Sequence, residues 1–234
     1  MAESTQFADS FAKVGAVFSL QPYRALLAAP DLGRAVMASI VGRLPISITG
    51  FAILLYVQSE TSSFGVAGTV SAIYVLGLAA LAPFLGRLID RIGPRPVLTL
   101  GAIVYPAALA LLIALVSLPA PLVWIALCAA LAGASLPPIT VCMRALYPQL
   151  LVEENLLHTA YSLDAALIEA VFILGPIVVS VFAAMGSPQS AIALAALCAA
   201  MGSFLFLRSP GVRRWKIHSL EKRAGLLGPL THPG

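Results

Sequence analysis

Long apolar stretches that are almost free of charged side chains constrain this chain more than any other feature of its sequence. The segment 96–143 alone runs for 48 residues without a charge. Only 10% of the 234 residues are charged and 60% are hydrophobic, whereas a soluble domain carries about 25% charged residues. A large soluble protein with unusually buried helices would need enough polar residues to cover its outside, and this sequence lacks them. The chain is therefore predicted to be an integral membrane protein.

Six stretches are long enough to cross a bilayer, because a spanning helix needs about 20 mostly apolar residues. Pro119 and Pro121 divide the 48-residue segment into two crossings, since proline cannot donate a helical N–H hydrogen bond. The tripeptide Gly186-Ser187-Pro188 marks a turn before the last crossing. The predicted helices cover residues 35–57, 64–86, 96–117, 122–147, 156–185 and 189–207. The predicted fold class is all-α, a polytopic membrane protein whose six transmembrane helices form one bundle.

Lysine and arginine are confined to alternate loops of this predicted topology. The loops around Glu60, Pro119 and Ser187 contain neither residue. Because cytoplasmic loops retain the positive charge, both termini are predicted to be cytoplasmic and the protein to lie in the cytoplasmic membrane. The chain then divides into a cytoplasmic N-terminal segment (1–32), the six-helix bundle (33–207) and a basic cytoplasmic tail (208–234).

Several function classes are not expected from the sequence. The net charge of +4 is accounted for by attraction to anionic lipid, so no nucleic-acid partner is predicted. The three cysteines lie in predicted helices without the spacing of metal ligands, and no glycine-rich phosphate loop is present. Neither a metal nor another cofactor is therefore expected. A membrane-embedded enzyme would need a nucleophile or metal ligands at one depth, and His158, the only histidine near a predicted helix, has no such partners.

The loop between the second and third predicted helices gathers three arginines and one aspartate into a glycine-bounded turn. It is similar to the signature G-x-L-(A/S)-D-R-x-G-(R/K)-(R/K) of the major facilitator superfamily of secondary transporters. The residues in register are Gly86, Leu88, Asp90, Arg91, Gly93 and Arg95. Ile89 occupies the small position of the signature, and Pro94 replaces a basic residue. The demand for cytoplasmic positive charge would supply the arginines, but not the aspartate or the two glycines.

This resemblance implies the fold and activity of a secondary active transporter for a small solute. It also implies that Asp90 and Arg91 belong to a charge network that latches two halves of the transporter in the outward-facing state. Arg144, at the inner end of the fourth predicted helix, lies at a similar depth and is a candidate partner for Asp90. Gly86 is expected to permit the close approach of another helix, and Gly93 a sharp reversal of the backbone.

The fifth predicted helix carries a second point of resemblance. Gly175 and Pro176 are similar to a glycine-proline pair in the proton-linked exporters of the family, which favours efflux. Val178–Ser180 lack the further glycines of those exporters. In the fourth predicted helix, Ala129 occupies the position at which those exporters often carry an arginine. Gly175 and Pro176 are expected to kink this helix, although a proline kink with a neighbouring glycine also occurs in many other membrane helices. The coupling ion and the solute are left open by the sequence.

Three ionisable residues lie inside predicted helices, where such residues usually line a cavity or pair with one another. Arg43 and Asp164 each lie about 12 Å from the inner end of their helices, at about 1.5 Å per residue. The first and fifth helices are neighbours in the resembled fold, so these two residues are able to pair. Arg43 could instead extend toward the inner interface. Glu169, about 20 Å deep by the same measure, is either a coupling residue or a structural carboxylic acid.

Transporters of the resembled kind place their solute between two six-helix bundles, so one bundle supplies only one wall of the cavity. The chain is therefore expected to be the N-terminal half or a truncated form of such a transporter. Its tail then corresponds to the central linker of a twelve-helix chain. The alternatives are a half-transporter that assembles with itself and a non-transporting scaffold or regulator. The expected partners are membrane lipid, a small solute and either a second six-helix half or a second copy.

Overall fold

The computed structural model describes residues 30–118 and 120–215, and all regular elements within them are helices. These helices are α3 (Pro30–Thr61), α4 (Phe64–Ile92), α5 (Pro94–Ser117), α6 (Leu122–Ser135), α7 (Ile139–Leu150), α8 (Glu154–Ala184), α9 (Pro188–Arg208) and α10 (Pro210–Arg213). They provide six candidate membrane spans, of which α6 and α7 together form the fourth. The predicted all-α fold with six spans is confirmed. Most of the predicted N-terminal segment and tail lies outside the described residues.

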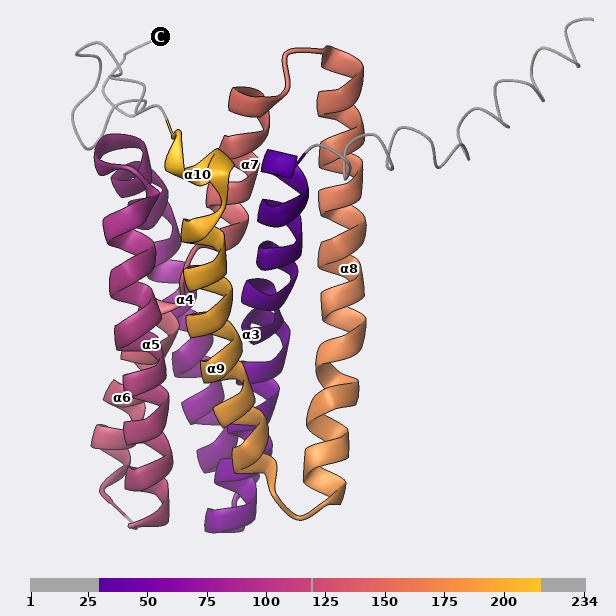
Figure 1. The fold of residues 1–234 in the computed structure, drawn as a ribbon. Helices are drawn as coiled ribbons and strands as arrows, with labels where there is room; N and C mark the ends of the chain where they lie inside the picture. Colours follow the sequence, from indigo (N-terminus) through magenta and orange to yellow (C-terminus); the bar gives the residue numbers. More distant parts are fainter. Residues whose placement is uncertain (1–29, 119, 216–234) are drawn as a thin grey trace, which may run out of the picture.

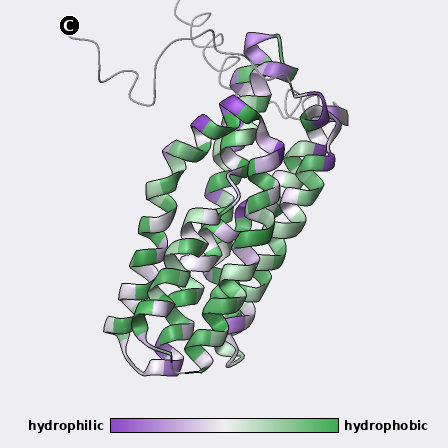
Figure 2. Ribbon diagram, turned by 90° about the vertical axis from the view of Figure 1, so that its left-hand side faces the viewer, coloured by the Kyte–Doolittle hydropathy of each residue, from purple (hydrophilic) through white to green (hydrophobic). Residues whose placement is uncertain are grey.

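The spans lie side by side with α3 between α9 and α8 (Figure 1). Hydrophobic residues cover most of their length, and hydrophilic residues gather mainly at the end that carries α10 (Figure 2). The α4–α5 and α7–α8 connections lie at this same end. We call it the arginine-rich end, because the arginines of the loops and helix termini in the described residues all lie there. Those arginines are Arg34, Arg87, Arg91, Arg95, Arg208, Arg213 and Arg214.

The fourth span is interrupted, so the prediction of one continuous helix over 122–147 is wrong. Pro137 and Pro138 follow each other, and neither can donate the N–H hydrogen bond that would continue the helix. The helix therefore ends at Ser135 and resumes at Ile139. The break packs tightly against α5, since a Cβ atom placed on Gly101 would lie 2.9 Å from the Ser135 carbonyl oxygen.

Glycines allow the central helices to pack backbone against backbone, as is common where lipid gives no hydrophobic drive for helix association. A Cβ atom on Gly202 of α9 would lie 2.3 Å from the Cα atom of Gly42 in α3. A Cβ atom on Gly133 of α6 would lie 2.0 Å from the carbonyl oxygen of Tyr74 in α4. These contacts hold α3 against α9 and α4 against α6, and they fix the frame on which the polar residues are placed.

Candidate functional site

A buried carboxylate, Asp164 of α8, accepts hydrogen bonds from side chains of two other helices. Arg43 of α3 donates from Nη2 to Oδ1. Arg144 of α7 donates from Nε to Oδ2 over 3.0 Å, and the Tyr147 hydroxyl donates to Oδ1 over 3.1 Å. We call these four residues the carboxylate cluster. It lies ten residues into α8, about 15 Å from the arginine-rich end, where a carboxylate is costly unless it is paired.

Arg43 is fully buried, with 1% of its side chain exposed. The structure thus joins Arg43 to Asp164, as the sequence analysis considered, and does not extend its side chain to the interface. Its Nε and Nη1 atoms have no hydrogen-bond partner among the described residues. The nearby hydroxyls of Ser39 and Ser47 donate to carbonyls of their own helix, those of Val36 and Leu44.

Arg144 belongs to the carboxylate cluster, although its sequence position made it a candidate partner for Asp90. Depth along a helix does not reveal the direction in which a side chain leaves it. Just over half of the Arg144 side chain, 55%, is exposed, so this guanidinium reaches from the surface of the bundle to the buried carboxylate. With two guanidinium groups and one carboxylate, the cluster carries a formal charge of +1.

Tyr147 is the member of the cluster that sequence reasoning missed. It lies three residues after Arg144, a spacing that puts both side chains on one face of a helix. Its ring meets that of Tyr161 edge to face, with centroids 5.5 Å apart, and its side chain is buried. The spacing was the available signal, but a tyrosine near the end of a span is also typical of an ordinary interfacial residue.

Glu169 lies five residues beyond Asp164 on the same helix and has a different environment. It is exposed on the outside of the bundle. Among the described residues it takes part in no ion pair or hydrogen bond that the structure records. It lies 15 residues, or about 22 Å, from the start of α8, near the middle of this helix.

The signature loop forms the end of α4 and the start of α5 at the arginine-rich end. Gly93 has a φ angle of +81°, which is the left-handed region that glycine adopts freely, so it provides the reversal predicted for it. Asp90, Arg91 and Arg95 are exposed. The close approach expected at Gly86 is not found, because no atom of the described bundle lies within 4 Å of a Cβ atom built there.

Gly175 is a second contact point between α8 and α3. A Cβ atom on this glycine would lie 2.3 Å from the Ser47 Oγ atom and 2.6 Å from its Cβ atom. Pro176 is exposed, and α8 continues through it to Ala184. Gly175 of α8 therefore packs against α3, while Pro176 faces away from α3.

The arrangement provides fixed charges rather than the groups of a covalent reaction. In the described part of the chain, no three side chains of the metal-ligating types come together. The cluster joins α8 to α3 and α7 through one carboxylate, so any change in the charge of that carboxylate alters the contact between three helices.

A comparison with known families identifies a match over most of the chain. Residues 35–232 match the family model described as Major Facilitator Superfamily. Comparisons with curated proteins and with solved structures found no match.

Proposed function

Since this chain belongs to the major facilitator superfamily, whose members are transporters and not enzymes, we propose that it forms one bundle of a secondary transporter that exports a small solute. The carboxylate cluster carries this proposal. Asp164 holds α8 against α3 and α7 through its ion pairs with Arg43 and Arg144. A change in this charged contact is the kind of local event that can bias a two-state transporter.

The open faces of α4 and α8 support a second bundle as the partner. In each of these two helices, only 17% of an apolar 18-residue stretch is buried inside the bundle, whereas 56% of the corresponding stretch is buried in α3. Glu169 lies on such an exposed face within its span, where a carboxylate in contact with lipid would be costly. A second six-helix half, or a second copy of this chain, would cover the face and complete the solute cavity.

The signature loop is proposed to act as the latch between the two bundles. Asp90, Arg91 and Arg95 are exposed at the arginine-rich end, where they are accessible to a facing bundle. We assign this end to the cytoplasm, together with the segment 1–32 and the tail 208–234, because positive charge is retained on that side of the membrane. The pair Gly175-Pro176 supports the efflux direction through its resemblance to exporters.

Orientation is tested by labelling single introduced cysteines in intact cells. Ser62→Cys and Arg213→Cys place exposed thiols at opposite ends of the bundle. A membrane-impermeant maleimide added outside should label the first and not the second, and the unsubstituted chain is the control for Cys128, Cys142 and Cys198, which are buried. If only Arg213→Cys were labelled, the arginine-rich end would lie outside the cell, which is the opposite of the proposed orientation.

Transport is tested in liposomes that contain a pH-sensitive dye. The chain is reconstituted alone and together with a candidate second half, and a panel of amphiphilic solutes is added under a pH gradient. Solute-dependent proton flux should require a second bundle and should be lost in Asp164→Asn. Flux from the chain alone, with crosslinking that shows a dimer, would identify the second copy as the partner. No flux in any combination would favour the scaffold alternative.

A further inference from the structure

A groove lies between α3 and α9 at the arginine-rich end, on a different side of α3 from the carboxylate cluster. Its volume is about 670 Å³. Arg34 lines this groove, and Arg43 follows it by nine residues, or two and a half helical turns, so that the two residues leave α3 on opposite sides. The side chains that line the groove include Arg34, Met37 and Val41 of α3, Leu205 and Arg208 of α9, and Ser209, which follows α9.

The floor of the groove is apolar and faces outward. Met37 is 63% exposed and Leu205 is 43% exposed, and Val41 continues the same surface of α3 toward the middle of the membrane. The one hydroxyl in this set, that of Ser209, is buried and already donates to the Phe206 carbonyl over 2.7 Å. Such a surface is suited to a hydrocarbon chain rather than to a polar solute.

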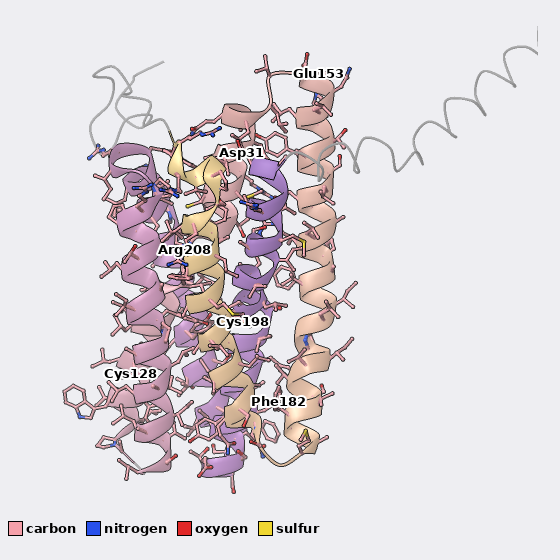
Figure 3. All side chains as sticks on the ribbon, viewed as in Figure 1. Asp31, Cys128, Glu153, Phe182, Cys198 and Arg208 are labelled. Carbon is pink, nitrogen blue, oxygen red and sulfur yellow. The ribbon has the colours of Figure 1, made fainter. Side chains whose placement is uncertain are left out.

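Two arginines line this apolar groove without an acidic partner among the described residues. Arg34 lies near the start of α3 and Arg208 ends α9. In Figure 3, Asp31 lies near the arginine-rich end, and Arg208 lies farther along the bundle toward its middle. Neither arginine forms an ion pair with another described residue. The nearby carboxylate of Asp31 is occupied by Arg214, whose Nη1 atom lies 3.0 Å from Oδ2.

The position of the Arg208 guanidinium indicates the depth at which an anion would be held. Its Cζ atom lies 4.1 Å from the centroid of the Phe204 ring, and Phe204 is one turn closer to the middle of the membrane. An arginine that only sought water would extend in the other direction. The cation–π contact therefore holds the positive charge on the exposed side of α9, beside the apolar part of the groove.

We propose that this groove binds an anionic phospholipid from the leaflet at the arginine-rich end. The phosphate lies between Arg34 and Arg208, and an acyl chain runs along Met37, Val41 and Leu205. Guanidinium groups bind phosphate oxygens through charge-assisted hydrogen bonds, and basic pockets between membrane helices on the cytoplasmic side suit anionic headgroups. A second bundle is not the proposed occupant, because the exposed carboxylate of Glu169, which such a partner would cover, lies on α8 and not on the helices that form this groove.

The proposal is tested by tryptophan quenching in lipid nanodiscs. Met37→Trp is introduced into the full chain after Trp124 and Trp215 have been replaced by Phe. The nanodiscs contain a small fraction of either dibrominated phosphatidylglycerol or dibrominated phosphatidylcholine, whose bromine atoms quench a tryptophan that they contact. Phosphatidylglycerol should bind with a preference of about fivefold for each arginine that faces its phosphate. Ile103→Trp, at a 65% exposed position on α5, should show no preference.

Charge variants decide whether the groove is responsible. Replacing both Arg34 and Arg208 by glutamine in the Met37→Trp chain should reduce the preference to about one. Arg213→Gln removes an exposed charge from the same end and should leave the preference within about twofold. Circular dichroism checks that each variant is folded.

Three results would overturn the proposal. These are equal quenching by both lipids, a preference that survives the loss of both arginines, and a lack of quenching by either lipid, which would mean that protein covers the groove. The assay involves no transport, so its failure and the failure of the proposed function are distinguishable.

Discussion

Asp164 and Glu169 are two carboxylates five residues apart on one helix, and the bundle treats them in opposite ways. Asp164 is buried and accepts hydrogen bonds from three side chains. Glu169 is exposed on the outside of the bundle. Five residues correspond to about 140° around an α-helix, which is enough to move a side chain from the packed face of α8 to its open face.

The difference shows which part of α8 is complete within this chain. The face with Asp164 and Gly175 is covered by α3 and α7. The Asp164 carboxylate is hydrogen-bonded there, and Gly175 packs against Ser47. The face with Glu169 is open, and its need for a partner is not met here. Stability should therefore depend on the first face, and communication with a partner on the second.

The largest effect on stability is expected from Asp164→Asn. This change keeps the shape of the side chain but leaves Arg43 as a buried cation without a counter-ion. Breaking a buried pair from one side typically costs about 3–5 kcal/mol. The free energy of unfolding should fall by about that amount, as measured by circular dichroism during unfolding in mixed micelles of mild detergent and sodium dodecyl sulfate.

A double variant separates the buried charge from the loss of contacts. Arg43→Met with Asp164→Leu replaces the pair by apolar side chains, and such replacements are often neutral or stabilising. It should recover most of the stability that Asp164→Asn loses. If Asp164→Asn were as stable as the unsubstituted chain, the carboxylate cluster would not be the anchor of α8.

A smaller loss is expected from Gly175→Ala at the second contact of the closed face. The added Cβ atom would lie 2.3 Å from the Ser47 Oγ atom, and overpacking of this kind typically costs about 1–3 kcal/mol. Ser47→Gly in the same chain removes the opposing side chain and should restore part of the stability. Gly68→Ala is the matched control, because nothing lies within 4 Å of a Cβ atom there. Equal unfolding curves for the two alanine variants would contradict the tight contact.

Much of this closed face could be predicted from the sequence. The features that were not predicted were missed for physical reasons. Hydropathy and proline spacing gave the six spans, and depth with helix adjacency suggested the pairing of Arg43 with Asp164. Depth along a helix carries no information about the direction in which a side chain points. Arg144 was therefore considered as a candidate partner for Asp90, although its Nε atom lies 3.0 Å from Asp164 Oδ2. The break after Ser135 was missed because long apolar runs masked the effect of the two consecutive prolines.

Tyr147→Phe should have a modest effect because it removes one of three donors to Asp164. Hydrogen bonds between membrane helices average about 0.6 kcal/mol, with a maximum near 1.7 kcal/mol. The free energy of unfolding should decrease within this range, since both arginines still neutralise the carboxylate. Tyr161→Phe is the control for the aromatic environment, because its hydroxyl donates instead to the Arg144 carbonyl over 3.4 Å. A loss as large as that of Asp164→Asn would mean that the hydroxyl, rather than the arginines, holds the carboxylate.

The smallest effect on stability is expected from Glu169→Gln, on the open face. An exposed side chain without a partner in its own bundle should change the free energy of unfolding of the chain alone by no more than about 0.5 kcal/mol. Its effect should appear only in the assembled transporter, where a covered carboxylate can exchange protons and glutamine cannot. Solute-dependent proton flux should then be lost while solute binding is retained. Glu154→Gln, at a position whose side chain is 89% exposed at the end of α8, should leave both stability and flux unchanged. If Glu169→Gln instead destabilised the isolated chain, the open face would be part of the bundle's own structure, and the contrast between the two carboxylates would not hold.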